Sequence, residues 1–248
     1  MSNRFGLLGE SLSHSISPLL HKYLGDYSYE LIERDYKGAE QLWQNHEYDG
    51  FNVTIPYKKL AYELCDELSP EAEAIGSVNT VVFSENGRSS GYNTDAFGFE
   101  YLLKRNDIDV NGKDCLILGT GGASLSVEYV LGLHNASSIT FCTRHIINPS
   151  ENLIEYDSLY KKADFDKISD YQIIINTTPV GMYNHDVDKS PINLEIFTGI
   201  EAVVDIIYNP IQTKLCEQAE KLGIKWASGL RMLIAQGYKA SELFKSKR

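Results

Sequence analysis

The stretch Asp114-Cys115-Leu116-Ile117-Leu118-Gly119-Thr120-Gly121-Gly122-Ala123-Ser124 joins a short apolar run to a glycine-rich turn and the start of an apolar helical pattern. Glycines let the main chain approach a pyrophosphate, and the helix that follows offers unpaired N–H groups to the anion. A glycine loop alone also fits a simple tight turn, but the flanking strand and helix favour a dinucleotide site. Ser124 replaces the usual third Gly or Ala and still permits close packing.

Strands and helices alternate outward from this loop. Towards the C-terminus, apolar runs predict strands at 138–142, 172–175 and 202–207, two of them nearly continuous, as in a parallel sheet covered on both faces. Helices are predicted over 95–104 and 232–245. The pattern indicates a doubly wound, Rossmann-like α/β domain.

The first half of the chain predicts a second α/β unit. Its β-rich runs are followed by helix-start signals, with Ser17 and Ser69 as N-caps before a proline. Asn86-Gly87 predicts a β-hairpin turn. The predicted strands are 5–9, 29–33, 50–55 and 78–83.

Composition excludes several classes of protein. The 248 residues carry a formal net charge of -11 and no basic stripe, which argues against nucleic acid as a partner. No signal peptide or long apolar span is present, so we expect a cytoplasmic protein with no membrane partner. The four cysteines are widely spaced, which predicts reduced, buried thiols and no metal site.

The strand after the glycine helix bears on the choice of nucleotide. An NAD site places an acid at the end of that strand, whereas this chain reads Phe141-Cys142-Thr143-Arg144. A guanidinium matches phosphate geometry, so Arg144 suits the 2'-phosphate of NADP. The alternative is a solvated surface arginine.

Four short motifs concentrate polar residues at strand ends in the first half. Each one alone fits a cap, a turn or a solvated side chain. The motifs are Ser13-His14-Ser15-Ile16-Ser17-Pro18, Asn52-Val53-Thr54-Ile55-Pro56-Tyr57-Lys58, Ser77-Val78-Asn79-Thr80 and Tyr92-Asn93-Thr94-Asp95.

Taken in order, these motifs resemble the shikimate dehydrogenase family over nearly the whole chain. The second half matches through Asn176-Thr177-Thr178-Pro179-Val180-Gly181-Met182, Asp205-Ile206-Ile207-Tyr208 and Gly229-Leu230-Arg231-Met232-Leu233-Ile234-Ala235-Gln236. The resemblance implies a substrate domain of residues 1–95 plus 232–248, an NADP-binding domain of residues 96–231, and a cleft between them. It also implies NADPH-dependent interconversion of 3-dehydroshikimate and shikimate in aromatic amino acid biosynthesis by a monomer or homodimer.

The resemblance also assigns roles to single residues. Lys58 and Asp95 would be the catalytic pair, with Lys58 donating a proton or hydrogen bond to the reacting oxygen. Ser15 and Ser17 would bind the substrate carboxylate. Thr54, Asn79, Asp95 and Gln236 would hold ring hydroxyls, with Tyr208 nearby. The implied cofactor-binding residues are Gly119, Gly121, Gly122, Ala123, Thr143, Arg144, Thr177, Gly229 and Met232.

Two departures from the family pattern leave alternatives open. The family commonly has a second cation shortly after the position of Arg144, but here no Lys or Arg follows until Lys161. In addition, Arg231 stands where the family usually has a small residue. Arg231 would either contact the cofactor or have a surface role. The rival hypotheses are a quinate or mixed quinate/shikimate dehydrogenase using NAD, and a catalytically silent paralogue that binds a metabolite or partner protein.

Overall fold

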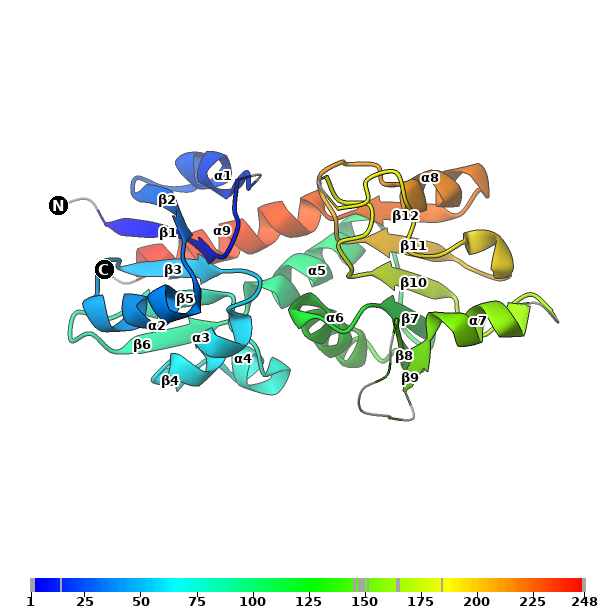
Figure 1. The fold of residues 1–248 in the computed structure, drawn as a ribbon, viewed down its shortest axis with the longest axis horizontal. Coiled ribbons are helices and arrows are strands. Elements are labelled where there is room, and N and C mark those ends of the chain that lie inside the picture. Colours follow the sequence, from blue (N-terminus) through cyan, green and yellow to red (C-terminus); the bar gives the residue numbers. More distant parts are fainter. Residues whose placement is uncertain are drawn as a thin grey trace. The chain divides into compact units, whose positions relative to one another are not determined.

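The computed structural model describes residues 3–13, 15–144, 146, 150, 152–163, 166–183 and 185–246. Its contacts divide the chain into two compact units: unit 1, with Met1–Gly98 and Ile234–Arg248, and unit 2, with Phe99–Leu233. Each unit is built around its own six-stranded sheet (Figure 1).

The sheet of unit 1 is mixed, in the order β2-β1-β3-β5-β6-β4. Strand β1 pairs in parallel with β2 and β3, whereas β5 is antiparallel to both β3 and β6. The carboxyl ends of β1, β3 and β6 and the amino end of β5 therefore lie at one edge. The strands are β1 (Arg4–Gly9), β2 (Ser28–Glu33), β3 (Gly50–Val53), β4 (Glu67–Leu68), β5 (Thr80–Phe83) and β6 (Ser89–Tyr92).

Helices cover both faces of this sheet. On one face, side chains of α2 (Tyr36–Asn45), α3 (Lys58–Leu64) and α4 (Pro70–Ile75) form a buried core with Leu8, Phe51 and Val81. On the other, Phe5 packs with Phe244 of α9 (Leu230–Ser246), and Tyr29 stacks on His21 of α1 (Ser17–Leu24). Strand alternation sends Asn52 to this second face, because its neighbours Phe51 and Val53 enter the first core.

Unit 2 has an entirely parallel sheet in the order β12-β11-β10-β7-β8-β9. Numbered within the unit, this is the Rossmann order 3-2-1-4-5-6, and the strand order reverses between β7 and β10. The elements are β7 (Asp114–Leu118), α6 (Gly122–Leu133), β8 (Ser138–Thr143), β9 (Leu153–Glu155), α7 (Tyr156–Ala163), β10 (Ile173–Asn176), the 3₁₀ helix η1 (Leu194–Ile196), β11 (Ala202–Asp205), α8 (Lys214–Lys221) and β12 (Lys225–Ser228). All four residues of β10 and of β11 are buried, as expected for a sheet covered on both faces.

The predicted α/β class and the doubly wound domain are confirmed, but some details are wrong. Strands β4, β9 and β12 are not predicted from the sequence; they are short, with two to four residues each. Ser69 caps α4 by accepting from the Ala72 N–H. Ser17 is the first residue of α1 and not its N-cap, which is Ile16 and has no side-chain hydrogen bond. The Ser17 N–H donates to Ser15 Oγ at 3.2 Å, and Ser17 Oγ accepts from Ser15 Oγ at 3.1 Å.

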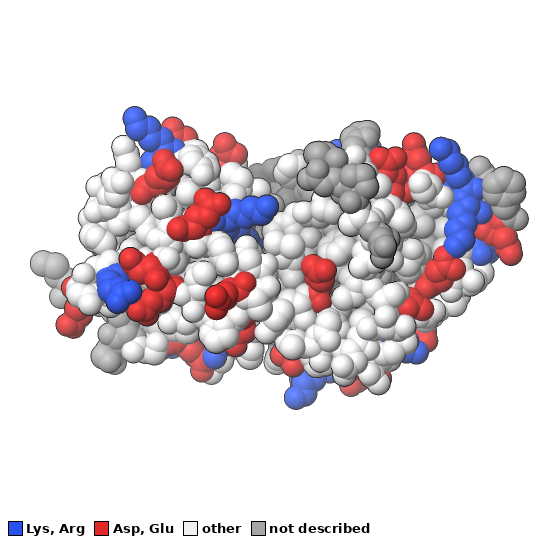
Figure 2. Space-filling model, turned by 90° about the horizontal axis from the view of Figure 1, so that it is seen from below, with Lys and Arg blue, Asp and Glu red and all other residues white. Residues whose placement is uncertain are grey.

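The described residues also bear on the cysteines, the surface and the membrane. All four cysteines are free thiols, three of them buried and Cys65 half-buried. Acidic and basic side chains are intermixed among uncharged areas on the face in Figure 2. No helix in the described ranges combines the length and apolar character needed to cross a bilayer. The same ranges hold no group of three or more His, Cys, Asp or Glu placed to bind a metal ion.

Candidate active site

The predicted substrate residues of unit 1 gather at one edge of its sheet. Thr54 follows β3 and its N–H bonds to the carbonyl of Leu8 in β1. Asn79 precedes β5, and its main chain bonds to Val53 and Tyr92 at the same edge. Helix α5 (Thr94–Arg105), which carries Asp95, begins directly after β6. Residues up to 157 positions apart in sequence therefore meet here.

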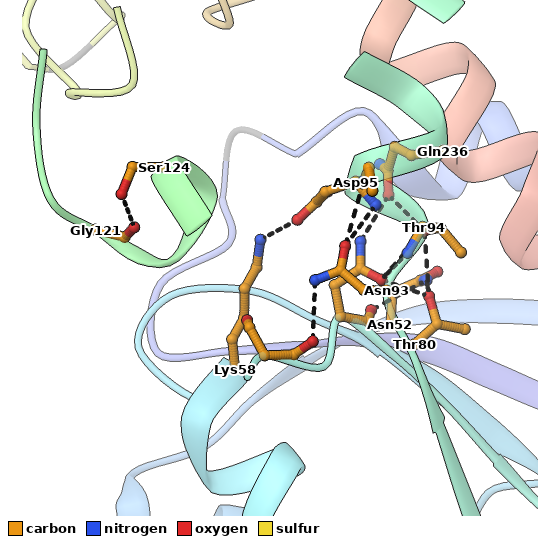
Figure 3. A network of polar contacts seen from close by, with 12 residues as sticks. Asn52, Lys58, Thr80, Asn93, Thr94, Asp95, Gly121, Ser124 and Gln236 are labelled. Carbon is orange, nitrogen blue, oxygen red and sulfur yellow. Dashed lines mark hydrogen bonds and ion pairs between the residues drawn. The ribbon is translucent and has the colours of Figure 1, made fainter. Parts of the chain in front are cut away.

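Lys58 and Asp95 form an ion pair, with 2.5 Å between Lys58 Nζ and Asp95 Oδ2 (Figure 3). Their side chains keep only 13% and 11% of their surface exposed. Lys58 begins α3, where the helix dipole disfavours a cation, and Asp95 lies in the first turn of α5, where the dipole favours an anion. The carboxylate thus offsets the unfavourable position of the ammonium and directs it.

Asn79, which is buried, and Gln236, which is half-buried, belong to one network of amides and hydroxyls. Asn79 Oδ1 accepts from the Thr94 N–H at 2.7 Å and from Thr80 Oγ1 at 3.0 Å. Its Nδ2 therefore faces the other way and donates to Gln236 Oε1 at 3.5 Å. The same oxygen accepts from Thr94 Oγ1 at 3.4 Å (Figure 3). Asn79 and Gln236 are thereby held with N–H groups available to acceptor oxygens.

Ser15 and Thr54 lie on loops of this unit, and Ser17 is the first residue of α1. Ser17 is buried, while Ser15 and Thr54 are half-buried. Ser15 Oγ donates to Ser17 Oγ and accepts from the Ser17 N–H. Paired hydroxyls are suited to an anionic oxygen, because each can turn its hydrogen towards it.

Several residues that support the predicted site are not predicted from the sequence. Asn93 Oδ1 accepts from the N–H groups of Asp95 and Ala96, so Asn93 caps α5 and Asp95 is free for Lys58. Asn52, Thr80 and Thr94 complete the network around Asn79. The motifs contain all four residues, but only the strand pairing shows which of them meet.

The glycine loop of unit 2 has the features of an anion cradle. The N-cap of helix α6 is Gly121, which has no side chain to accept a hydrogen bond from the first N–H groups of the helix. A Cβ on Gly121 would meet nothing within 4 Å, whereas Gly119 has φ +101° and its Cβ would meet Thr178 at 2.9 Å. Ser124 is buried, and its Oγ donates to the Gly121 carbonyl at 2.7 Å (Figure 3). The residues present therefore fit a bound pyrophosphate.

Other predicted cofactor residues of unit 2 make identifiable contacts. Thr177 follows β10, and its N–H and Oγ1 both donate to the Leu118 carbonyl. A Cβ on Gly229 would lie 1.8 Å from the Ile206 carbonyl oxygen, so glycine is required there by chain packing. Met232 is buried, and Tyr208 is half-buried with its pKa raised by burial.

Arg144 follows β8 and is exposed, and Thr143 at the end of β8 is half-buried. Ile146 donates its N–H to Glu155 Oε1 at 3.0 Å. Residues 145 and 147–149, where a second cation is sought in the sequence, lie outside the described residues. An exposed guanidinium at a strand end is available to an anionic ligand.

Arg231 has a structural role. Its Nη1 donates to the carbonyl of Arg105 and to Asn106 Oδ1, the latter at 2.8 Å. These acceptors lie at the carboxyl end of α5, where a cation is favoured by the helix dipole. Arg231 is exposed, which agrees with a surface role, and its guanidinium caps the carboxyl end of α5.

Unit 2 also contains a fully buried carboxylate, Asp205, at the end of β11. It accepts from Thr213 Oγ1 at 2.7 Å, Asn176 Nδ2 at 3.0 Å and the Ile207 N–H at 3.1 Å. Burial raises its pKa to about 6, although these three donors act in the opposite direction. Asp205 therefore ties the ends of β10 and β11 to the start of α8.

Comparison with known proteins identifies the family. Residues 7–81 match the shikimate dehydrogenase substrate binding domain. A shikimate dehydrogenase (NADP(+)) of Caldanaerobacter subterraneus is 38% identical over 94% of this chain and 88% of its own length.

Solved structures agree. Shikimate dehydrogenase 1 of Peptoclostridium difficile superposes with a TM-score of 0.88 at 35% identity, covering 98% of this chain and 92% of that one. Shikimate 5-dehydrogenase of Thermus thermophilus, solved with NADP(H) and shikimate, gives a TM-score of 0.83 at 32% identity over 98% and 94% of the two chains. On the strength of the whole-length match and of the Lys58–Asp95 pair beside its hydroxyl and amide network, this chain belongs to the shikimate dehydrogenase family.

Proposed function

We propose that this protein is an NADP-dependent oxidoreductase that interconverts 3-dehydroshikimate and shikimate, acting in the cytoplasm on the route to aromatic amino acids. The observation that carries this function is the Lys58–Asp95 ion pair, set in the same unit as the Asn79–Gln236 network. The chain is also similar over nearly its whole length to proteins named for this activity.

The proposed chemistry assigns the proton to Lys58. Reduction of a ketone leaves negative charge on its oxygen, and the Lys58 ammonium donates a proton or a strong hydrogen bond to that oxygen. Asp95 accepts from the ammonium at 2.5 Å and fixes its direction. In the oxidation direction the neutral amine takes the proton from the hydroxyl. NADPH, when bound, supplies the hydride, so the protein provides orientation and electrostatics.

Substrate recognition follows from the groups that unit 1 leaves available. Ser15 and Ser17 offer hydroxyls to the carboxylate, and Thr54, Asn79, Asp95 and Gln236 hold the ring hydroxyls. A buried site of this kind rejects analogues that lack a hydroxyl, because its own donors and acceptors are then unpaired. We expect Tyr208 to lie near the substrate as well.

Unit 2 fits the cofactor. Gly119, Gly121, Gly122 and Ala123 would hold the pyrophosphate through main-chain N–H groups, and Arg144 and Thr143 would meet the 2'-phosphate. Thr177, Gly229 and Met232 would lie along the nicotinamide half of the cofactor. The open space at Gly121 and the uncapped start of α6 support this assignment.

Initial rates of shikimate oxidation test the proposal, with NADP and with NAD, with quinate as competing substrate. We expect fast turnover with shikimate and NADP. Preference for NAD or quinate would replace this function with that of a quinate/shikimate dehydrogenase. Ligand binding in a titration without any turnover would identify a silent paralogue. Sedimentation of the same sample decides between monomer and homodimer.

A further inference from the structure

Thr80 lies at the centre of the polar network but is not among the predicted substrate residues. Its side chain is completely buried. Thr80 Oγ1 accepts from Asn52 Nδ2 at 2.9 Å and donates to Asn79 Oδ1 at 3.0 Å (Figure 3). Only a hydroxyl can accept on one side and donate on the other with the same atom, so among residues of this size serine alone could replace it.

The direction of these hydrogen bonds is fixed by main-chain groups at both ends. Asn52 Nδ2 also faces the Asn79 carbonyl at 3.4 Å, which can only accept. Asn79 Oδ1 receives the Thr94 N–H at 2.7 Å, which can only donate. Asn52 Nδ2 therefore donates to Thr80 Oγ1, and the hydroxyl hydrogen of Thr80 points to Asn79 Oδ1.

The chain of hydrogen bonds begins at Tyr29. Its hydroxyl donates to Asn52 Oδ1 at 2.7 Å, and its ring stacks on His21 with 3.8 Å between ring centroids and 4° between planes. Burial, with a smaller effect of Lys245, lowers the pKa of His21 to about 4, so the stacked imidazole is neutral near neutral pH. The Tyr29 hydroxyl is thus held on a rigid aromatic pair.

We propose that Thr80 is a positioning residue for substrate binding: its hydroxyl, supported by Asn52 and Tyr29, locks the Asn79 amide with Nδ2 facing the substrate. This inference rests on the proposed function of the site. If the amide turned over, Asn79 Oδ1 would face Gln236 Oε1, and two acceptors would meet. The network thereby makes Asn79 a donor and selects a substrate oxygen that accepts.

Two substitutions at one position separate the hydroxyl from the shape of the side chain. Thr80→Val keeps the shape and removes the hydroxyl, whereas Thr80→Ser keeps the hydroxyl. We expect Thr80→Val to raise KM for shikimate about tenfold, with kcat and KM for NADP changed less than about threefold, as for loss of one buried hydrogen bond. Thr80→Ser should restore KM to within about threefold of wild type.

A double-mutant cycle with Asn79→Ala shows whether Thr80 acts through Asn79. In the Asn79→Ala background, Thr80→Val should change KM for shikimate by less than about twofold, because there is no amide left to orient. Tyr29→Phe keeps the ring stack and removes the hydroxyl, so it should raise KM for shikimate about threefold. Tyr48→Phe is its control, since that hydroxyl bonds to Glu30, away from His21 and the network.

The outcomes distinguish the inference from the function beneath it. Wild-type protein that turns over neither shikimate nor quinate would overturn both. An active wild type with unchanged KM in folded Thr80→Val protein would overturn the inference alone. Equal effects of Thr80→Val with and without Asn79 would do the same. So would a fall in kcat and in melting temperature accompanied by a rise in KM for both substrates, because those changes would indicate a general structural role. Tyr29→Phe supplies the answer if Thr80→Val fails to fold.

Discussion

The two units use their polar side chains in opposite ways. In unit 1, Lys58, Asn79 and Gln236 make hydrogen bonds that leave N–H groups available. In unit 2, Asp205 and its partners are occupied with one another and with nearby main chain. There the available donors belong to the main chain at the start of α6.

This difference fits the two proposed ligands. A small polyol with several hydroxyls needs donors and acceptors of different kinds at defined points, which side chains supply. A pyrophosphate needs close approach of repeated N–H groups, which glycines and a helix start supply. Removing a side chain should therefore impair the chemistry in unit 1, whereas adding one should impair cofactor binding in unit 2.

The largest effect is expected from Lys58→Ala in unit 1. Loss of the proton donor should lower kcat about 100-fold to 10,000-fold with little change in KM, the usual size for a general acid or base. Lys59→Ala is the matched control, because Lys59 is the next residue along the chain and lies outside the ion pair. Steady-state kinetics measure both variants, and an undiminished kcat in Lys58→Ala would remove Lys58 from the chemistry.

The second prediction concerns the pH dependence of stability, which should run in opposite directions in the two units. His21 in unit 1 has its pKa lowered to about 4 from 6.5 by burial, so the unfolded chain binds more protons between these values. Its stabilisation is present above pH 6.5 and is lost as the pH falls towards 4. Asp205 in unit 2 has its pKa raised to about 6 from 3.8, so the folded chain binds more protons there. Its stabilisation is present below 3.8 and is lost as the pH rises through 6.

Each group changes the free energy of unfolding by about 3 kcal/mol between its folded and unfolded pKa values, at roughly 1.4 kcal/mol for each pKa unit. Urea unfolding between pH 4.5 and 6.5 should show a steeper acid loss in Asp205→Asn and a shallower one in His21→Phe than in wild type. The chain has two tryptophans, Trp43 in unit 1 and Trp226 in unit 2. Single-tryptophan variants therefore report each unit by fluorescence, and parallel slopes in all proteins would contradict the assignment.

Much of unit 2 follows from local sequence signals. A strand, a glycine loop and an apolar helix are contiguous at 114–133, so the pattern alone predicts β7 and α6. The family resemblance places Lys58 and Asp95 together, and the ion pair agrees with it.

What the sequence does not predict depends on contacts between distant segments. Asn93, and not Asp95, caps α5, and Arg231 caps the other end of the same helix from 125 residues away. Local capping rules identify candidates but cannot choose between neighbours. The short strands β4 and β9 have too few residues for a periodic pattern, so only their pairing partners define them.

A third, smaller effect is expected in unit 2 from Gly121→Ala. Gly121 has φ -82°, which alanine adopts, and its Cβ would meet nothing within 4 Å, so the fold should be unchanged. The methyl group would stand where the pyrophosphate approaches and should raise KM for NADP about tenfold, with KM for shikimate unaffected. Gly132→Ala, in the same helix and also in open space, should leave KM unchanged and add about 0.5–1 kcal/mol of stability. Equal KM values in the two variants would exclude the glycine loop as the cofactor site.

The smallest effect is expected from Arg144→Ala. This variant tests whether a side chain of unit 2, in addition to the main chain, contributes to cofactor binding. Arg144 is exposed, so its contact with a 2'-phosphate is screened by solvent and should be weaker than a buried pair. We expect KM for NADP to rise about twofold to fivefold, which corresponds to at most about 1 kcal/mol for such an exposed contact, and KM for NAD to stay constant. Lys161→Ala, the next cation along the chain, is the control. If both cofactors lose affinity equally, Arg144 does not contact the 2'-phosphate, and discrimination between NADP and NAD must come from elsewhere in unit 2.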